Sequence, residues 1–225
     1  MDKLIALIKQ RYVGQFMTIA VTGSVSVGKS TFAETISKAL GIQVKVISTD
    51  HFLMSNQTLI AQDLFGQKGF PQTYDLESLE QVIKAFKQGE KSVEIPIYTQ
   101  ENSDIDPNNQ QIIERPDILI IEGVVALRLK QTDFKIYLEA DLEDIKWWYL
   151  SRTLAMTAQA KDNKSSWRYQ YTTMPIGELA DLTMKTWDET NQVNLDNYIL
   201  PSKQYADVVV YLDKNHDVED IKIKD

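Results

Sequence analysis

The stretch VTGSVSVGKST, residues 21–31, decides the fold because its spacing is that of a phosphate-binding loop. Two glycines bracket four residues, and Lys29 and Ser30 follow the second glycine at once. An apolar, strand-like run at residues 17–21 precedes the loop, and a helical pattern at residues 30–40 follows it. Strand, loop, Lys-Ser pair and helix agree, which disfavours the alternative of a glycine-bearing loop that binds nothing.

Each part of this loop has a chemical task. The glycines allow a tight turn whose backbone N–H groups can hold phosphate oxygens, and the helix adds its positive N-terminal end. The ammonium of Lys29 would reach the β- and γ-phosphates, and the hydroxyl of Ser30 would ligate Mg²⁺. We therefore expect ATP and Mg²⁺ as cofactors, with ATP bound by Gly23, Ser24, Val25, Ser26, Val27, Gly28, Lys29, Ser30 and Thr31.

Length and composition narrow the class of protein. The 225 residues contain no Pro/Gly/Ser-rich linker and no repeat, which predicts a single domain over residues 1–225 with an N-terminal helix at residues 1–14. A formal net charge of −8 disfavours nucleic acid and anionic membrane surfaces as partners and favours a small-molecule substrate. No apolar run reaches the length of a bilayer span, and the absence of cysteine agrees with a cytoplasmic location.

Strand-like and helical runs alternate along the chain. This alternation predicts an α/β fold of the P-loop NTPase type, a single domain whose mostly parallel sheet has helices on both faces. In such sheets, ligands bind beyond the carboxyl ends of the strands. The strand-like runs are residues 17–21, 43–49, 117–123, 134–140 and 207–213, and the helical runs are residues 75–89, 141–160 and 177–190.

Two carboxylates end strand-like runs and are candidates for catalysis. Asp50 is our first choice for the base that deprotonates an acceptor, and its alternative role is that of a turn-forming residue. Glu122 follows the buried run ILII and could hold Mg²⁺ directly or through water, as Ser30 would. We name Asp50, Lys29 and Glu122 as the catalytic set and interpret His51 as structural.

Six segments in this order resemble the bacterial type I pantothenate kinases, which belong with uridine kinases and phosphoribulokinases. The segments are GSVSVGKST, STDHFL, GFPQTYD, DILIIEG, WWYLSR and ETNQVNLDNYILP. The match extends from about residue 17 to the C-terminus, and KGFPQTYD is its most specific part. The chain resembles a short member of this family that lacks the N-terminal extension.

The resemblance implies a function and a set of site residues. It implies an ATP-dependent kinase that phosphorylates the primary hydroxyl of pantothenate, the first step of coenzyme A biosynthesis, with Asp50 as the base. It also implies homodimers and regulation by coenzyme A. Pantothenate offers a carboxylate, an amide and hydroxyls, which suit phenol, guanidinium and carboxamide groups. The residues that match the family's pantothenate pocket are Asp50, Tyr98, Tyr149, Arg152 and Asn191.

The sequence departs from the family's pattern in the walls of that pocket. Gln100 stands where the family has a histidine on its nucleotide- and coenzyme A-contacting surface, Ser103 replaces an aromatic residue, and Met156 replaces a phenylalanine. Changed walls can change the substrate, so a sibling kinase for uridine, another nucleoside or a sugar alcohol stays open. A non-catalytic, nucleotide-binding regulatory paralogue is the alternative from another class.

Two further expectations concern the segment that follows residue 141. The small, polar run AQAKDNKSS at residues 158–166 predicts a lid at about residues 155–175, which would close to exclude water. Before it, we expect Trp147, Trp148 and Leu150 to pack the helix against the sheet.

Overall fold

A six-stranded sheet forms the centre of the structure, a computed structural model that describes residues 1–224. Its strand order is β2-β5-β1-β6-β7-β8, and every pair of neighbours is parallel except β7 and β8. The predicted mostly parallel sheet is therefore confirmed. The strands are β1 (Met17–Gly23), β2 (Val44–Ser48), β5 (Ile118–Glu122), β6 (Phe134–Glu139), β7 (Val208–Leu212) and β8 (Val218–Ile223).

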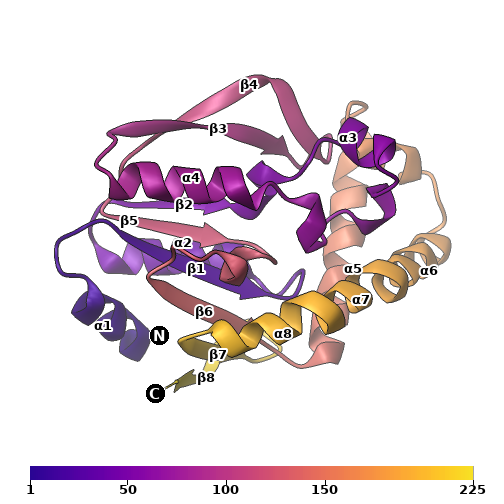
Figure 1. Cartoon of the computed structure of the whole chain (residues 1–225). Coiled ribbons are helices and arrows are strands. Elements are labelled where there is room, and N and C mark those ends of the chain that lie inside the picture. The colour runs from indigo at the N-terminus through magenta and orange to yellow at the C-terminus, as the bar shows by residue number, and fades with distance from the viewer. Residues whose placement is uncertain (225) are drawn as a thin grey trace.

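Helices cover both faces of this sheet, as the sequence predicts (Figure 1). Ile118 and Ile120 of β5 pack toward α1 and α2, whereas Leu119 and Ile121 pack toward α4. This alternation follows from the period of two in a strand, and it explains why β5 is apolar at every position up to its final residue. The helices are α1 (Asp2–Arg11), α2 (Lys29–Leu40), α3 (Asn56–Ala61), α4 (Leu76–Lys87), α5 (Leu142–Gln159), α6 (Ile176–Thr186), α7 (Gln192–Asn194) and α8 (Leu200–Ser202).

An antiparallel hairpin that the sequence analysis did not predict lies on α4 (Figure 1). It consists of β3 (Ser92–Thr99) and β4 (Asp104–Glu114). Pro96 sits where the pairing register shifts, which a two-stranded hairpin tolerates because each strand has a free edge. Ile95 and Ile113 are buried against α4 and anchor the hairpin to the domain.

The last predicted helix, at residues 177–190, is longer in the structure. Helical backbone runs from Ile176 to Ser202 because two π-helical turns, Trp187–Asn191 and Leu195–Ile199, continue α6 into α7 and α8. Each π turn contains one residue more than an α turn and so rotates the side chains that follow it.

Trp147 corrects one expectation about α5. Its side chain is 66% exposed and does not pack the helix against the sheet. Trp148 does pack on the core, where its ring stacks on His216 with 3.6 Å between ring centroids and its Nε1 donates to the carbonyl of Lys214 at 3.2 Å.

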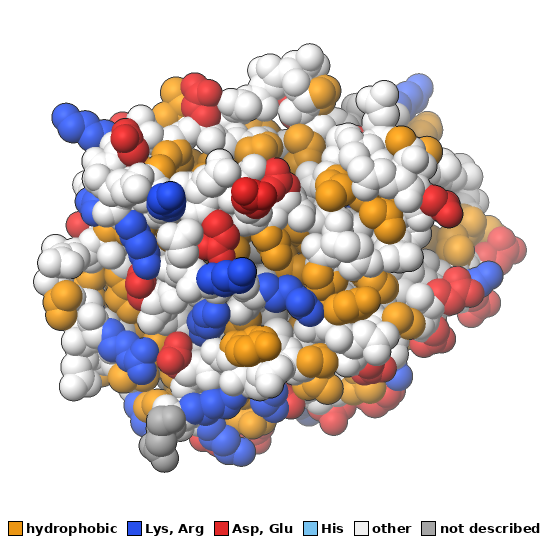
Figure 2. Space-filling view, in the orientation of Figure 1, with side chains coloured by type: hydrophobic (Ala, Val, Ile, Leu, Met, Phe, Trp, Pro, Cys, Tyr) orange, Lys and Arg blue, Asp and Glu red, His pale blue; other side chains and the backbone are white. Residues whose placement is uncertain are grey.

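Charges of both signs are spread over the face shown in Figure 2, where Lys and Arg lie among Asp and Glu. None of the described helices is both long enough and apolar enough to cross a bilayer.

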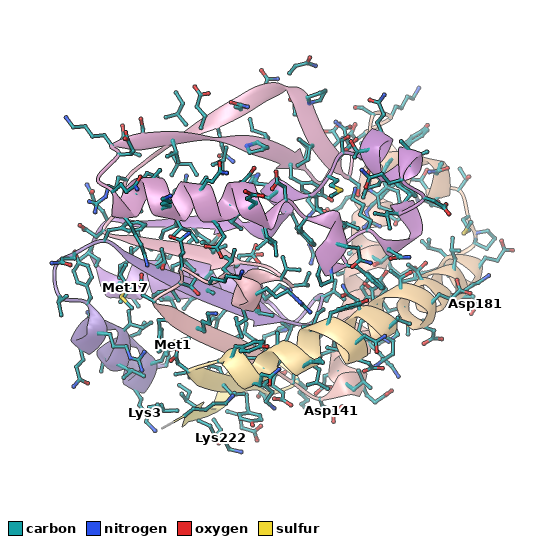
Figure 3. All side chains as sticks on the ribbon, viewed as in Figure 1. Met1, Lys3, Met17, Asp141, Asp181 and Lys222 are labelled. Carbon is teal, nitrogen blue, oxygen red and sulfur yellow. The ribbon has the colours of Figure 1, made fainter. Side chains whose placement is uncertain are left out.

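The carboxyl ends of the parallel strands form one edge of the sheet. Met17 marks the amino end of β1, and Asp141 follows the carboxyl end of β6, so this edge faces α5 (Figure 3). In the pairing register, Glu122 lies beside Val21 on one side and Ser48 on the other. Three chain segments that are far apart in sequence therefore meet at this edge.

Gly123, which follows β5, tests how tightly this edge is packed. A Cβ atom at this position would lie 1.8 Å from Oγ1 of Thr49, and the backbone φ is 152°. We expect Gly123→Ala to lower the free energy of unfolding by more than about 2 kcal/mol because overlap and strain add. Gly177→Ala is the matched control, since nothing lies within 4 Å of its added Cβ, and it should change stability by less than about 1 kcal/mol. Equal melting temperatures for the two variants would contradict the close approach.

Candidate active site

The loop between β1 and α2 has the geometry of an anion cradle. Ser26 and Gly28 have positive φ angles of 63° and 90°. Gly28 precedes α2 without a side-chain cap, so the first N–H groups of that helix keep their hydrogen-bonding capacity. Within the described residues, the enclosed hydroxyl oxygens of Ser24 and Ser26 also have no hydrogen-bond partner. The loop can therefore donate several hydrogen bonds to a phosphate.

Lys29 and Ser30 start α2 and connect the cradle to the carboxylates. The ammonium of Lys29 donates to the carbonyl of Ser24 at 2.8 Å, and Oγ of Ser30 donates to Oε1 of Glu122 at 3.0 Å. Burial lowers the pKa of Lys29, and the carboxylates of Glu122 and Asp50 oppose this shift. The positive charge of Lys29 is thus balanced locally by the two acidic groups that the sequence predicted.

Glu122 is buried at the sheet edge, with only 7% of the residue exposed. Burial raises its pKa and the charge of Asp50 raises it further, whereas Lys29 and the hydroxyl of Ser30 lower it. The loop after Glu122 is fixed by Thr22, whose hydroxyl donates to the carbonyl of Gly123 at 2.8 Å. A buried carboxylate beside a serine hydroxyl is a set of hard oxygen donors of the kind that Mg²⁺ prefers.

Asp50 lies in the turn that follows β2. Its N–H donates to Oγ of Ser48 at 3.2 Å, and its Oδ1 accepts a hydrogen bond from the hydroxyl of Tyr74 at 3.1 Å. Burial, together with the charge of Asp50, raises the pKa of Tyr74 well above its ordinary value. The phenol therefore keeps its proton at neutral pH and orients the carboxylate. Tyr74 belongs to the segment KGFPQTYD, but the sequence analysis gave it no role.

A cavity of about 520 Å³ opens at the carboxyl edge of the sheet. Its walls come from the loop after β1, the turn after β2, the hairpin, α5 and the helical run at residues 187–199. The structure brings all the predicted catalytic, metal-binding and acceptor-binding residues to this one cavity. They are Lys29, Ser30, Asp50, Tyr98, Glu122, Tyr149, Arg152 and Asn191.

A second cavity of about 380 Å³ lies on the other side of the loop. Trp148 and His216 form part of its wall. The two cavities share four lining residues, which mark the boundary between them: Ser26, Lys29, Ser30 and Arg152.

The predicted ATP-binding residues differ in which of the two cavities they line. Val25 lines the larger cavity, and Gly28 and Thr31 line the smaller one. Gly23, Ser24 and Val27 line neither cavity. The side chain of Val27 packs in the hydrophobic core, so only its backbone is available to a ligand.

Several residues that sequence analysis did not select also line the larger cavity. His51 lies in its wall, where Nδ1 accepts from the N–H of Tyr98 at 3.1 Å and burial lowers the pKa of the imidazole, as suits a structural role. Asn194 faces the cavity and donates to the carbonyl of Gly69 at 2.8 Å. No local pattern marks these positions, because the hairpin and the π-helical turns bring them to the site. The remaining unpredicted polar residues of the lining include Ser48, Lys68, Tyr74 and Arg168.

Comparisons with known proteins agree with this geometry. The family model described as "Phosphoribulokinase / Uridine kinase family" matches residues 18–156. The pantothenate kinase of Streptococcus pneumoniae serotype 19F (strain G54) is 38% identical over 220 residues, covering 92% of this chain and 72% of that protein.

Two solved structures share the fold. The D-glycerate 3-kinase from Cryptococcus neoformans var. grubii matches with a TM-score of 0.63 and 14% identity, covering 99% of this chain and 98% of that one. A structure titled as a possible uridine kinase from Bacillus stearothermophilus matches with a TM-score of 0.59 and 17% identity, covering 92% and 95%. At these identities the likeness supports the fold alone.

Fold and site together define a P-loop kinase of small molecules. The chain belongs to the phosphoribulokinase/uridine kinase family, and this membership implies the use of ATP. The resemblance inferred from the sequence motifs is thereby confirmed.

Lys29 allows a direct test of the phosphate cradle. We expect Lys29→Met to weaken ATP binding by about 10-fold to 100-fold, because a charge-assisted contact to the phosphates is lost. Isothermal titration calorimetry with ATP measures the change. Lys38→Met, at the exposed end of the same helix, is the matched control and should bind ATP as the wild type does. Equal affinities for the two variants would contradict the role of Lys29.

Proposed function

We propose that this protein is an ATP-dependent kinase that phosphorylates the primary hydroxyl of pantothenate. The observation that carries the proposal is the shared boundary between two cavities, since Lys29 and Arg152 line both of them and Asp50 lines the larger one. The 38% identity to a pantothenate kinase over most of this chain supports the choice of acceptor.

The smaller cavity suits ATP. It is lined by the start of α2, where N–H groups and Lys29 favour the phosphates, and by the aromatic pair Trp148 and His216. A Cβ at Gly28 would lie 3.1 Å from Cδ2 of His216, so glycine keeps this entrance open. ATP supplies an electrophilic γ-phosphorus and a good leaving group.

Ser30 and Glu122 are the residues that would hold Mg²⁺. Their oxygens already lie 3.0 Å apart, and no cluster of three His, Cys, Asp or Glu side chains suited to a metal occurs among residues 1–224. Mg²⁺ commonly takes only one or two protein ligands and completes its shell with phosphates and water. When bound, it neutralises charge on the phosphates.

Asp50 acts as the base in this proposal. Tyr74 holds Oδ1, while Oδ2 has no hydrogen-bond partner within the described residues and is available to the acceptor hydroxyl. Asp50 accepts the proton as the acceptor oxygen bonds to the γ-phosphorus and ADP leaves. Lys29 and Arg152, at the boundary of the cavities, stabilise the charge on the phosphoryl group during transfer.

The rest of the larger cavity provides groups for the acceptor. Tyr98 and Tyr149 offer phenols, and Asn191 offers a carboxamide. Gln100 and Met156 line the same cavity, so the departures from the family's pattern lie at the acceptor site. This observation keeps a sibling kinase with another alcohol as the second candidate.

A phosphoryl-transfer assay tests the proposed acceptor. Purified protein is supplied with ATP, Mg²⁺ and one of pantothenate, uridine, cytidine or a sugar, and mass spectrometry detects the product. The proposal predicts phosphopantothenate as the dominant product. If uridine or a sugar is phosphorylated and pantothenate is inert, the sibling kinase is correct. If no acceptor reacts while ATP still binds, the regulatory alternative is correct.

Asp50→Asn tests the base. We expect kcat to fall by about 100-fold or more while ATP affinity stays within about 2-fold, because a general base contributes to transfer and the carboxamide keeps the size of the side chain. Asp63→Asn is the matched control, because Asp63 is exposed and follows the end of α3. This variant should keep full turnover. Undiminished turnover of Asp50→Asn would remove Asp50 from the mechanism.

The segment at residues 155–175 is proposed as a lid. It contains the end of α5 and two 3₁₀ segments, Ala160–Asp162 and Trp167–Tyr171. It contacts the turn of the hairpin, since the N–H of Trp167 donates to the carbonyl of Glu101 at 3.1 Å and Nδ2 of Asn163 donates to its Oε1 at 3.1 Å. These few exposed contacts can open without disturbing the core.

Limited proteolysis tests the lid. Exposed Lys161 and Lys164 offer trypsin sites, and we expect cleavage there to slow at least several-fold when a non-hydrolysable ATP analogue and pantothenate are both bound. Lys91, an exposed residue between α4 and β3 that lines neither cavity, serves as the internal reference site. Equal cleavage of the lid with and without ligands would contradict closure.

A further inference from the structure

Arg168 brings a cationic group from the proposed lid into the larger cavity. The guanidinium lies over the ring of Trp167, with 4.4 Å between its central carbon and the ring centroid. Its Nε is enclosed and has no hydrogen-bond partner among the described residues. Stacking on Trp167 thus holds the guanidinium in place while leaving part of its hydrogen-bonding capacity unused.

No carboxylate within the described residues forms an ion pair with Arg168. The two acidic groups that line the cavity lie at its phosphoryl-transfer end, where Glu122 accepts from Ser30 and Asp50 accepts from Tyr74 through Oδ1, and neither forms an ion pair with Arg168. Burial lowers the pKa of Arg168, and the positive charge of Arg152 lowers it further. The cavity therefore holds a partly buried cation with an unmet demand for negative charge.

Two other cationic residues of the cavity, Lys68 and Arg152, are less suited to bind an acceptor there. The ammonium of Lys68 donates to Oδ1 of Asn56 at 2.7 Å and to the carbonyl of Ser103. Arg152 lines both cavities, so it is shared with the phosphate side, whereas Arg168 lines only the larger one. Arg168 is therefore the cationic group available to the part of an acceptor that lies away from the phosphate-binding loop.

The neighbours of Arg168 indicate which ligand it faces. The phenols of Tyr98 and Tyr149 lie near the guanidinium and oppose the lowering of its pKa by burial. Both residues belong to the proposed acceptor site. A guanidinium binds a carboxylate through two parallel hydrogen bonds, and flanking phenols can donate to the same group. Gln100, on the same wall, is neutral and cannot supply this charge.

We propose that Arg168 binds the carboxylate of the acceptor and selects acidic acceptors over neutral ones of the same shape. This inference rests on the proposed function and extends it, since it names the residue that recognises the acidic end of pantothenate. Because Arg168 belongs to the proposed lid, binding of the carboxylate also holds that segment against the cavity.

Steady-state kinetics of Arg168→Gln test the proposal, with pantothenate and with pantothenol, in which a neutral hydroxymethyl group replaces the carboxylate. We expect KM for pantothenate to rise by about 10-fold to 100-fold, as for the loss of a charge-assisted contact, with kcat and KM for ATP within about 3-fold of wild type. The wild type should prefer pantothenate to pantothenol, and the variant should lose this preference. Arg168→Lys should lie between the two enzymes.

Lys164→Gln is the matched control because it removes the same charge from an exposed position of the same segment. It should keep the KM of the wild type, and melting temperatures should show that all variants are folded. A merely structural role of Arg168 would alter both acceptors equally and would overturn the proposal, as would an unchanged preference for pantothenate in Arg168→Gln.

The wild-type data separate this inference from the proposed function. If pantothenate is phosphorylated but Arg168→Gln keeps its preference, the acceptor is right and the role of Arg168 is wrong. The wild type could instead reject pantothenate and phosphorylate another carboxylate-bearing alcohol such as glycerate. If Arg168→Gln then loses that activity at low acceptor concentration, the proposed function is wrong, but the proposed carboxylate-binding role of Arg168 is right. If only neutral acceptors react, both are wrong.

Discussion

The parallel register of β2, β5 and β1 is the constraint on which the site depends. It aligns the ends of three strands so that Glu122 lies between Val21 and Ser48. Each of these strand ends then supplies one group that a kinase needs. The anion cradle follows β1, Asp50 follows β2, and Glu122 is the last residue of β5. A slip of one residue in β5 would turn Glu122 to the opposite face of the sheet.

This arrangement concentrates charge where water is scarce. Burial lowers the pKa of Lys29 and raises that of Glu122, so it disfavours the charged form of both residues, and the nearby charge of Asp50 raises both pKa values. Mutual attraction offsets part of this cost, and the triphosphate that the site is proposed to bind would add negative charge beside Lys29 and the enclosed serine hydroxyls. The site is therefore arranged to hold an anion beside Lys29, which is typical of a preorganised active site.

Much of the fold could be predicted because its signals are local. The loop motif, the buried run of β5 and the amphipathic pattern of α4 each lie within a few residues, and the N-cap of α4 is also local, since Asp75 accepts from the N–H of Ser78 at 2.9 Å. The hairpin was missed because Pro96 and the many polar residues of β4 do not follow a strand pattern. Trp147 was assigned wrongly because hydrophobicity alone does not give the direction of a side chain on a helix.

The composition of the site could be predicted only in part. Residues carried by motifs, such as Lys29 and Glu122, lie in the cavity as expected. Tyr74 and Arg168 depend on long-range packing, since Tyr74 reaches Asp50 across 24 residues and Arg168 enters from a segment that looks like a polar loop in the sequence. Asn191 ends the first π-helical turn and Asn194 precedes the second, and the rotation that a π-helical turn introduces has no simple sequence signature.

A crystal structure with a non-hydrolysable ATP analogue, Mg²⁺ and pantothenate would test the central claim most directly. The account predicts phosphates on the loop beside Lys29, and the primary hydroxyl of pantothenate in the larger cavity within hydrogen-bond reach of Asp50, in line with the γ-phosphate. An acceptor hydroxyl bound away from Asp50, or a nucleotide seated in the larger cavity, would contradict it.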